Sequence, residues 1–420
     1  MTRFLGLRNF HRSALLLIAG AVVWGSVARA DDDNARWVGT WSASMEAPFG
    51  PTVTFDHVTL RQIVHVTIGG DHVRVRFSNT IGSIPFAIGT ASVALRSIGA
   101  SVRAGSLRQL QFFGANSITI PPGAVAISDS VSLDVEAGAD LAISLFVPTA
   151  EPGTTQLALA HQTSYVSTSG DFTGATTLPV ASTTTSWYWL SGVEVMAERP
   201  SRAVVAFGDS ITEGLASTTD ANARWPDVLF RRLHSHGGTQ SVSVLNEAIS
   251  GNRVLNDFIG PNAEKRVDRD VLTQAGLTYV IMLLATNDMG FSQFPPGSFG
   301  PDVLLTNVSA AEIIAGYEQI IRRVHQAGAK IYGGTVLPFE GAGYYDAGVE
   351  PKRAALNHFI RTSGKFDGVI DFDAVMRDPT HPTRMRPEFD SGDHLHPNDA
   401  GYAAMGNSID LGLFFAEEDD

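Results

Sequence analysis

Five residues in the second half of the chain are of types that could transfer an acyl group, and each follows a short apolar run: Ser210, Gly251, Asn287, Asp393 and His396. Acyl transfer needs a nucleophile, a base, a group that orients the base, and donors for the developing oxyanion. Ser210 would attack, His396 would take its proton and return it to the leaving alcohol, and Asp393 would fix the imidazole tautomer. The N–H groups of Ser210 and Gly251 and the Asn287 amide would hold the oxyanion. The set predicts acyl transfer.

The spacing of these residues has a physical reason. Asp393 and His396 are three residues apart, so a single turn can bring the carboxylate to the imidazole. Gly251 has no side chain, which lets its backbone approach a ligand closely. Local spacing therefore agrees with the proposed chemistry.

Each residue taken alone also has a simpler interpretation. Ser210 is followed three residues later by Glu213, a pattern typical of a helix N-cap with a capping box. Gly251 and Asn287 could be turn residues, and the acid and base could lie in a hydrated loop. Because all of them follow strands of one predicted sheet, a common site is the better hypothesis.

The elements that must position these residues show a pattern of short apolar runs alternating with helical stretches. The runs are residues 203–207, 242–246, 279–285, 330–336 and 368–372, and the clearest helical stretches are 227–237, 310–328 and 351–364. Such alternation predicts a parallel sheet with helices on both faces. In open sheets of this kind, sites form at the carboxyl ends of the strands. The predicted domain covers residues 199–420.

The region before it has a different period. Between Trp37 and Val195 apolar and polar residues mostly alternate, with Gly, Pro and Thr between the runs. In residues 63–77 two alternating runs meet at Gly69, Gly70 and Asp71, which predicts a tight hairpin. We expect a β-rich, sandwich-like accessory domain over residues 31–198.

Residues 1–30 are typical of an export signal. Three arginines precede an apolar run, and Ala28 and Ala30, on either side of Arg29, offer small residues for cleavage. The run is too short to be a convincing membrane span. We expect an exported protein, periplasmic or extracellular, that begins near Asp31 and has no stable membrane anchor. An uncleaved N-terminal anchor is the alternative.

The amino-acid composition limits the classes of partner that the protein can bind and the catalytic groups that it can use. The formal net charge is −13, and no basic run is present, which argues against nucleic acid or anionic lipid as the main partner. The chain has no cysteine, so thiolate nucleophiles, cysteine metal sites and disulfides are excluded. A small-molecule or glycan ester is the expected partner, and the sequence makes no prediction of oligomeric state.

Four sequence blocks resemble the SGNH hydrolases, also called the GDSL esterase/lipase family. They are "FGDSITEG", "NEAISGNR", "ATND" and "DHLHP", and they occur in the family's order within about residues 201–415. The resemblance implies a flavodoxin-like three-layer α/β/α domain and ester hydrolysis through an acyl-enzyme without a metal or cofactor. The segments "WVGTWSAS" and "VRVRFSN" also look like the β-rich domain that precedes the catalytic domain in some exported bacterial members.

Carried over residue by residue, the resemblance assigns the nucleophile to Ser210, the oxyanion donors to Gly251 and Asn287, and the acid and base to Asp393 and His396. The third block departs from the family, because Ala285 stands where glycine is usual. We expect a small shift of the local backbone there and no loss of activity. Short acyl esters, acetyl first and carried on carbohydrates, are the expected substrates, with general short-chain esterase or lipase activity as the alternative.

Two further functions are open. A metallo-phosphoesterase could gather metal ions with side chains of the same loops: Asp209, Asp393, His394 and His396. A protein without activity could bind glycans through its β-rich domain, where Trp187 and Trp189 share one strand face and could form a sugar platform. Aromatic residues at strand spacing more often belong to a core. His325 and His358 fall on predicted helices and are expected to be packed or surface residues.

Overall fold

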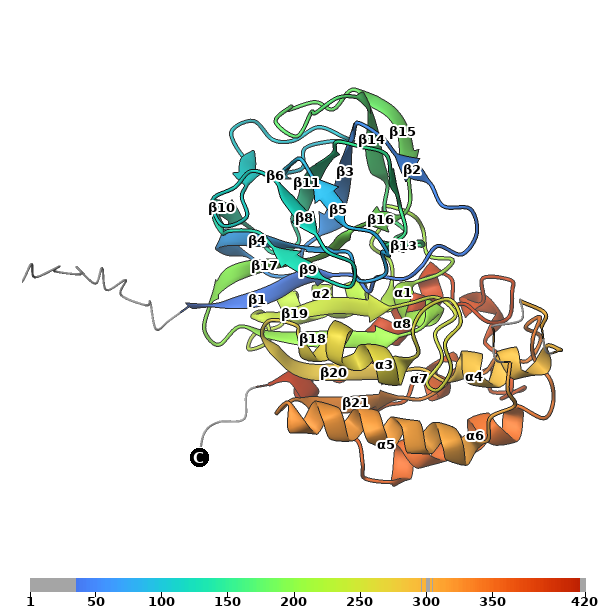
Figure 1. The fold of residues 1–420 in the computed structure, drawn as a ribbon. Helices are drawn as coiled ribbons and strands as arrows, with labels where there is room; N and C mark the ends of the chain where they lie inside the picture. Colours follow the sequence, from blue (N-terminus) through green and yellow to red (C-terminus); the bar gives the residue numbers. More distant parts are fainter. Residues whose placement is uncertain (1–34, 296, 300–302, 304, 416–420) are drawn as a thin grey trace, which may run out of the picture. The chain divides into compact units, whose positions relative to one another are not determined.

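The computed structural model describes residues 35–295, 297–299, 303 and 305–415, and the predicted export signal lies outside them. β structure comes first along the chain, and strands alternate with helices after it (Figure 1). The last strand of the β-rich region, β17, ends at Glu198, and the first strand of the parallel sheet, β18, begins at Arg202. The predicted fold class, a β-rich region followed by a parallel α/β domain, is confirmed.

The β-rich region consists of two main antiparallel sheets and three short strand pairs. One sheet has the order β1-β17-β4-β10, with β9 also paired to β4, and the other has the order β15-β14-β3-β11-β6-β7. The strands of the first are β1 Ala35–Ser42, β17 Leu190–Glu198, β4 Gly70–Ser78, β10 Val131–Val135 and β9 Val125–Ile127. Those of the second are β15 Val180–Thr184, β14 Ser164–Ser169, β3 Val58–His65, β11 Asp140–Val147, β6 Thr90–Leu95 and β7 Arg108–Leu110. The short pairs are β2 Thr54–Phe55 with β12 Glu151–Pro152, β13 Gln156–Leu157 with β16 Trp187–Tyr188, and β5 Phe86–Ile88 with β8 Ile118–Ile120.

The predicted hairpin at Gly69, Gly70 and Asp71 is wrong. Strands β3 and β4 flank this segment, but they belong to different sheets, so the chain crosses from one sheet to the other. The two glycines serve close packing: a Cβ on Gly69 would lie 2.3 Å from Val135 O, and a Cβ on Gly70 would lie 2.3 Å from Met196 O. Glycine here permits backbone contact with neighbouring strands and does not mark a turn.

The second region is built on a five-stranded parallel sheet of order β19-β18-β20-β21-β22. Its strands are β18 Arg202–Gly208, β19 Val242–Ala248, β20 Leu277–Leu283, β21 Lys330–Gly334 and β22 Gly368–Ile370. The chain order is the flavodoxin-like one, with the switch of direction at β18. All five predicted strands are present in this sheet.

Helices connect these strands. The α-helices are α1 Ser210–Glu213, α2 Trp225–Ser235, α3 Ala263–Val267, α4 Thr286–Gly290, α5 Ala310–Gln326, α6 Glu350–Thr362, α7 Phe372–Met376 and α8 Asp399–Ser408. A π-helical turn η1 Asp268–Leu272 follows α3, and the 3-10 turns are η2 Phe291–Gln293, η3 Pro387–Phe389 and η4 Leu411–Phe414. No helix within the described residues is long and apolar enough to cross a membrane.

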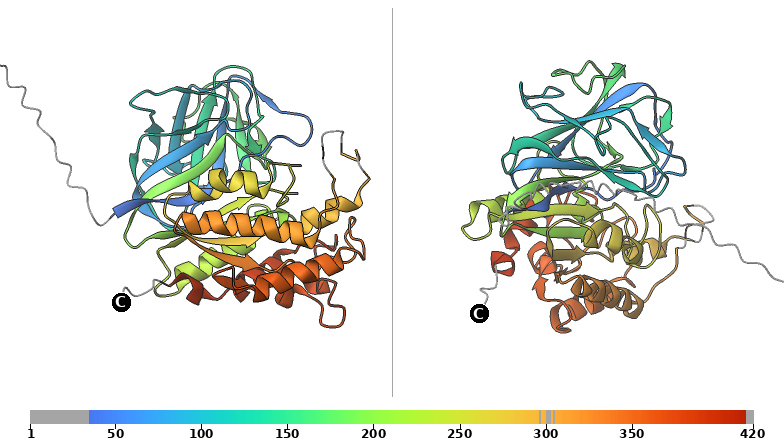
Figure 2. Two further views of the ribbon diagram at one scale, coloured as in Figure 1. Left: turned by 60° about the horizontal axis from the view of Figure 1, so that its bottom comes forward. Right: turned by 60° about the vertical axis from the view of Figure 1, so that its left-hand side comes forward.

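Alternate residues of the inner strand β18 face the two helical layers. Val204 and Ala206 pack in one apolar cluster with residues of α2, α7 and α8. Val205 and Phe207 pack in another cluster with residues of α5 and α6, which lie side by side on that face (Figure 2). A strand buried on both faces explains the continuous apolar run, and the result is a three-layer α/β/α arrangement.

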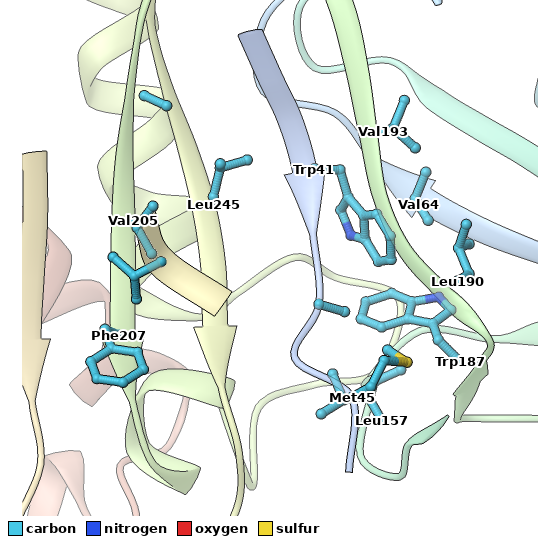
Figure 3. Packing of buried hydrophobic residues seen from close by; sticks show 14 of the residues in the cluster. Trp41, Met45, Val64, Leu157, Trp187, Leu190, Val193, Val205, Phe207 and Leu245 are labelled. Atoms are coloured by element: carbon cyan, nitrogen blue, oxygen red, sulfur yellow. The ribbon is translucent and has the colours of Figure 1, made fainter. Parts of the chain in front are cut away.

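The β-rich region packs against the edge strand β19. Thr67 Oγ1 accepts from Val244 N at 3.1 Å and donates to Val244 O at 3.3 Å, so backbone groups at the sheet edge have partners. One apolar cluster contains Leu245 of the parallel sheet together with Trp41 and Trp187 of the β-rich region (Figure 3). The two regions therefore share a core beside the sheet that carries the site.

Candidate active site

Ser210 lies directly after strand β18, as the first residue of the short helix α1. Asp209 is the N-cap, and its carboxylate accepts from Ile211 N at 3.1 Å. The helix-cap interpretation of Ser210 is therefore wrong, because the neighbouring aspartate occupies that position. Glu213 does not close a capping box either, since its carboxylate accepts from Ser250 Oγ. The Ser210 hydroxyl is thus left for another partner.

That partner is His396. Ser210 Oγ lies 2.8 Å from His396 Nε2, and both residues are buried. His396 Nδ1 lies 2.6 Å from Asp393 Oδ2. Because an ionised carboxylate only accepts, Nδ1 carries the proton and Nε2 is free to accept from the serine hydroxyl. The three side chains form a hydrogen-bonded relay with the polarity that a general base requires.

Asp393 is held as an anion by its surroundings. Its Oδ1 accepts from His396 N at 2.8 Å and from Leu395 N at 2.9 Å. Partial burial raises the pKa of Asp393, but the hydrogen bonds from His396 and from these backbone groups lower it more, and the result lies well below the usual range. The carboxylate therefore stays charged at neutral and mildly acidic pH and can orient the imidazole.

Gly251 follows strand β19 in a backbone conformation that favours glycine, with φ +70°. A Cβ on this residue would lie 2.7 Å from Ile259 Cδ1, so a side chain would be both strained and crowded. The backbone N–H groups of Ser210 and Gly251 have no acceptor within the described part of the chain. Both are available to a ligand oxygen.

Asn287 is the second residue of helix α4 and is buried. Its Nδ2 donates to Asn252 O at 3.1 Å and to Asp209 Oδ2 at 3.3 Å, and its Oδ1 accepts from Tyr344 Oη at 3.2 Å. These contacts fix which end of the amide carries the donor. The structure thus places the predicted oxyanion side chain in contact with the residue before Ser210.

Ala285, which departs from the family pattern, has a left-handed backbone with φ 95° and ψ −14°. Only glycine adopts such angles without strain, because the Cβ of other residues meets the backbone. The third block therefore keeps the backbone path that glycine allows, at the expense of local strain. Helix α4 still begins at the next residue, Thr286.

Two buried groups near the site were not predicted. The Arg266 guanidinium donates to Gly208 O at 2.8 Å, to Glu247 O at 2.8 Å and to Asn252 Oδ1 at 2.9 Å, and it lies 4.2 Å from the Phe207 ring centroid. It connects the end of β18 with the loop after Gly251. Nothing in the sequence around Arg266 distinguishes it from an exposed helical arginine, since its partners come from other strands.

The second unpredicted group is the Asp288 carboxylate. It accepts from Val254 N at 2.8 Å and from Leu255 N at 3.2 Å, and burial raises its pKa to about 6. The residue next to Asn287 therefore holds the loop that follows Gly251. Burial also raises the pKa of Asp209 to about 7. The polar groups around the relay are thus largely removed from water.

The side chains of the metallo-phosphoesterase alternative do not converge. Asp209 bonds to Ile211 N and Asn287, whereas His394 Nδ1 lies 2.6 Å from Asp390 Oδ2. No group of three or more acidic or histidine side chains with metal-site geometry occurs among the described residues. The residues present therefore do not suit the metal-binding hypothesis.

The two tryptophans considered for sugar binding lie in the core, and the two histidines on predicted helices lie on the surface. Trp187 and Trp189 are 2% and 1% exposed, so the sugar-platform interpretation is wrong and the core interpretation is confirmed. His325 pairs with Asp367 at 2.8 Å on the surface, and His358 is exposed. Neither histidine joins the site.

A five-stranded parallel sheet of this order with a Ser–His–Asp relay at its strand ends defines a class, the α/β/α serine hydrolases. Residues 206–404 match the GDSL-like Lipase/Acylhydrolase family. This part of the chain belongs to that family, as the sequence blocks predicted, and the protein is a carboxylic ester hydrolase.

Comparison with other proteins adds the following. No curated protein matches the sequence. Among solved structures, a carbohydrate acetylesterase from Sinorhizobium meliloti is 17% identical (49% of this chain, 95% of that one, TM-score 0.37). An aryl esterase from M. smegmatis is 18% identical (50% and 96%, TM-score 0.39), and an acetyl xylan esterase is 18% identical (49% and 96%, TM-score 0.36). These scores are too low to assign a substrate to this chain.

Proposed function

We propose that this protein hydrolyses esters of short acyl groups, acetyl first, through an acyl-enzyme on Ser210. The observation that carries the proposal is the relay in which Ser210 Oγ lies 2.8 Å from His396 Nε2 and His396 Nδ1 lies 2.6 Å from Asp393. A serine hydroxyl is a weak nucleophile unless an adjacent base takes its proton, and this geometry supplies the base.

The proposed reaction has two halves. Ser210 Oγ bonds to the ester carbonyl carbon as its proton passes to His396 Nε2, and the carbonyl electron pair moves onto oxygen. Collapse of this intermediate breaks the bond to the alcohol, which leaves with the proton from His396. Water then gives a proton to His396 and attacks the acyl-enzyme, and the proton returns to Ser210 Oγ as the acid is released.

Three donors stabilise the oxyanion in this proposal. They are the N–H groups of Ser210 and Gly251 and the Nδ2 amide of Asn287, which exchanges its longer bond, the 3.3 Å contact with Asp209 Oδ2, for a bond to the oxyanion. Support comes from the free backbone donors and from the contacts that hold the Asn287 amide in one orientation. Donors held in place before the reaction stabilise developing charge without reorganisation.

The short acyl group is supported by the crowding beside the oxyanion donors. Ile259 packs against Gly251, and Tyr344 bonds to Asn287, so side chains stand close to both donors. Carbohydrate esters are one class of substrate that we propose, on the expectation of an exported protein with an accessory β-rich region. The test is a panel of 4-nitrophenyl esters of increasing chain length, run beside acetylated glycans with Ser210→Ala as the blank.

The covalent step has its own test. A fluorophosphonate should label wild-type protein at Ser210, and a chelator should leave turnover unchanged. Activity should fall in acid, because a protonated His396 cannot accept the serine proton. Turnover that persists in Ser210→Ala but disappears with a chelator would contradict the mechanism.

We also propose that the protein is exported and that the mature chain begins near Asp31. The support is the arrangement of arginines, apolar run and small residues in residues 1–30. N-terminal sequencing of the protein recovered from the periplasm or the medium tests this. An intact N-terminus in the membrane fraction would favour the anchor alternative.

A further inference from the structure

A cluster of aromatic rings lies beside the Asn287 side chain. We call it the aromatic cluster, and it consists of Phe49, Phe258, Phe291, Phe294, Phe299 and Tyr344. Phe258 is at its centre, with ring centroids 4.7 Å from Phe291, 5.0 Å from Phe299 and 6.0 Å from Phe49. Its members come from the loops after β19, β20 and β21 and, through Phe49, from the β-rich region. Separate segments thus converge on one place.

The aromatic cluster is tied to the site by geometry. Tyr344 Oη donates to Asn287 Oδ1 at 3.2 Å, and the Tyr344 and Phe291 rings are 5.5 Å apart. Phe291 follows Asn287 by four residues on the helical turn of α4, and its N–H donates to Asn287 O. Side chains so spaced begin about 6 Å apart on one helix face. The cluster therefore stands within the span of an ester substituent from the oxyanion donors.

Glycine at position 290 makes this arrangement possible. A Cβ on Gly290 would lie 1.7 Å from Tyr344 Cε2, so the Tyr344 ring lies directly on the backbone of α4. Any side chain at this position would displace the ring and its bond to Asn287. The sequence thus provides for close contact between the cluster and the site.

The residues of the aromatic cluster are partly or largely exposed to solvent. Phe49 is 66% exposed, and the other members are partly exposed, whereas Trp187, Trp189 and Trp225 are 2% exposed or less. Single exposed apolar residues are ordinary, but a contiguous apolar patch next to a catalytic centre marks a ligand surface. An apolar group that covers these rings would gain the free energy of removing both surfaces from water.

The chemical nature of the six rings indicates which kind of ligand the aromatic cluster binds. Five of the six are phenylalanines, which offer no hydrogen bond to sugar hydroxyls. The polar side chains beside Phe291 are Ser292 and Gln293, and both donate to Met289 O. We propose that the aromatic cluster is an apolar subsite that binds a ring-bearing or alkyl group of the ester substrate, an inference that rests on the proposed esterase function.

Two isomeric esters test whether the cluster takes the alcohol or the acyl part. Benzyl acetate carries its ring on the alcohol, methyl phenylacetate carries it on the acyl group, and methyl acetate has no ring. Wild-type kcat/KM for benzyl acetate should exceed that for methyl acetate by about 10-fold, the value of burying one ring, because the proposed substrates have a short acyl group and the ring then comes from the alcohol. Xylose tetraacetate serves as the sugar probe.

Variants locate the preference. Phe258→Ala removes the central ring, and Phe49→Ala removes a largely exposed ring that the folded state does not need. Either change should reduce kcat/KM for the preferred ring ester several-fold, chiefly through KM, and leave methyl acetate nearly unchanged. Phe113→Ala is the matched control, because Phe113 is 99% exposed and lies outside the cluster. It should change neither value.

The results that would overturn the subsite are clear. They are equal turnover of methyl acetate and both isomers, or equal loss of ring ester, xylose tetraacetate and methyl acetate in Phe49→Ala and Phe258→Ala. Hydrolysis of methyl acetate by Ser210→Ala would count against the proposed function instead. The two failures are therefore distinguishable.

Discussion

Two histidine–aspartate pairs lie in one seven-residue segment, residues 390–396, and their surroundings differ. His396 Nδ1 is 2.6 Å from Asp393, and His394 Nδ1 is likewise 2.6 Å from Asp390. The His396 side chain is 10% exposed and reaches Ser210, whereas the His394 side chain is 54% exposed. The contact between acid and base is the same in both pairs. Burial of the imidazole and a nucleophile on its far nitrogen distinguish the predicted catalytic pair.

The largest expected effect is the difference between removing the imidazole of His396 and removing that of His394. His396→Ala should lower kcat by about 10³-fold or more, because no other group can take the Ser210 proton. His394→Ala should stay within a few-fold of wild type. Steady-state rates on 4-nitrophenyl acetate, with folding checked by circular dichroism, measure both. Equal losses in the two variants would remove the distinction between the pairs.

The next largest effect separates the two carboxylates. Asp393→Asn should lower kcat by about 10²- to 10³-fold, since an amide can donate to Nδ1 and favour the wrong tautomer. Asp390→Asn keeps an oxygen for the N–H groups of Gly392 and His394 and should change kcat little. The same assay applies. Wild-type kcat in Asp393→Asn would show that His396 needs no orienting anion.

A smaller effect is expected at the oxyanion side chain. Tyr344→Phe removes the bond to Asn287 Oδ1 but keeps the ring, so kcat on methyl acetate should fall by about 10-fold or less with KM nearly unchanged. Gly290→Ala displaces the ring and should have a similar or greater effect on kcat. A change confined to KM in Tyr344→Phe would mean that the hydroxyl does not position the amide.

The smallest expected effect is on the pH dependence of the free energy of unfolding, to which Asp209 and Asp393 contribute with opposite signs. Burial raises the pKa of Asp209 from 3.8 to about 7 in the folded protein. From about pH 4 to about pH 7 the unfolded chain has lost this proton and the folded chain keeps it, so rising pH disfavours folding by up to about 1.4 kcal/mol per unit. The lowered pKa of Asp393 has the opposite sign: its contribution to stability is lost only as pH falls through the acid range.

Urea unfolding of Asp209→Asn and wild type at about pH 5 and about pH 7 checks the sign. The free energy of unfolding of Asp209→Asn, relative to that of the wild type, should be greater at about pH 7 than at about pH 5. Buried acids that do not interact with Asp209 titrate in both proteins and cancel in the comparison, whereas loss of the repulsion between Asp209 and Asp288 is part of the measured difference. A difference that does not change with pH would contradict the raised pKa of Asp209.

Much of the site could be predicted because its parts are local in sequence. The Asp393–His396 contact is set by a spacing of three residues, and the glycine at position 251 is required by its backbone angle. The five apolar runs of the second region predicted the strands of the parallel sheet, and parallel strand ends meet at one edge. The order of the blocks along the chain therefore predicted that Ser210 and His396, 186 residues apart, could meet.

Other features depended on contacts that no local pattern reveals. Alternation in residues 63–77 indicated two strands, but only packing decided that β3 and β4 enter different sheets. The N-cap of α1 went to Asp209, because its carboxylate reaches Ile211 N while the Ser210 hydroxyl meets His396.

The sequence by itself predicted a nucleophile, a base, an acid and the strands of the parallel sheet, because these follow from residue type, short spacing and period. The tertiary structure alone decided the environment of those groups. Arg266 meets Gly208 across 58 residues, and Phe49 meets Phe258 from another region of the chain. The physical reason is that burial and long-range contacts arise only when separate segments pack, and they set the charge, access and apolar surface around the relay.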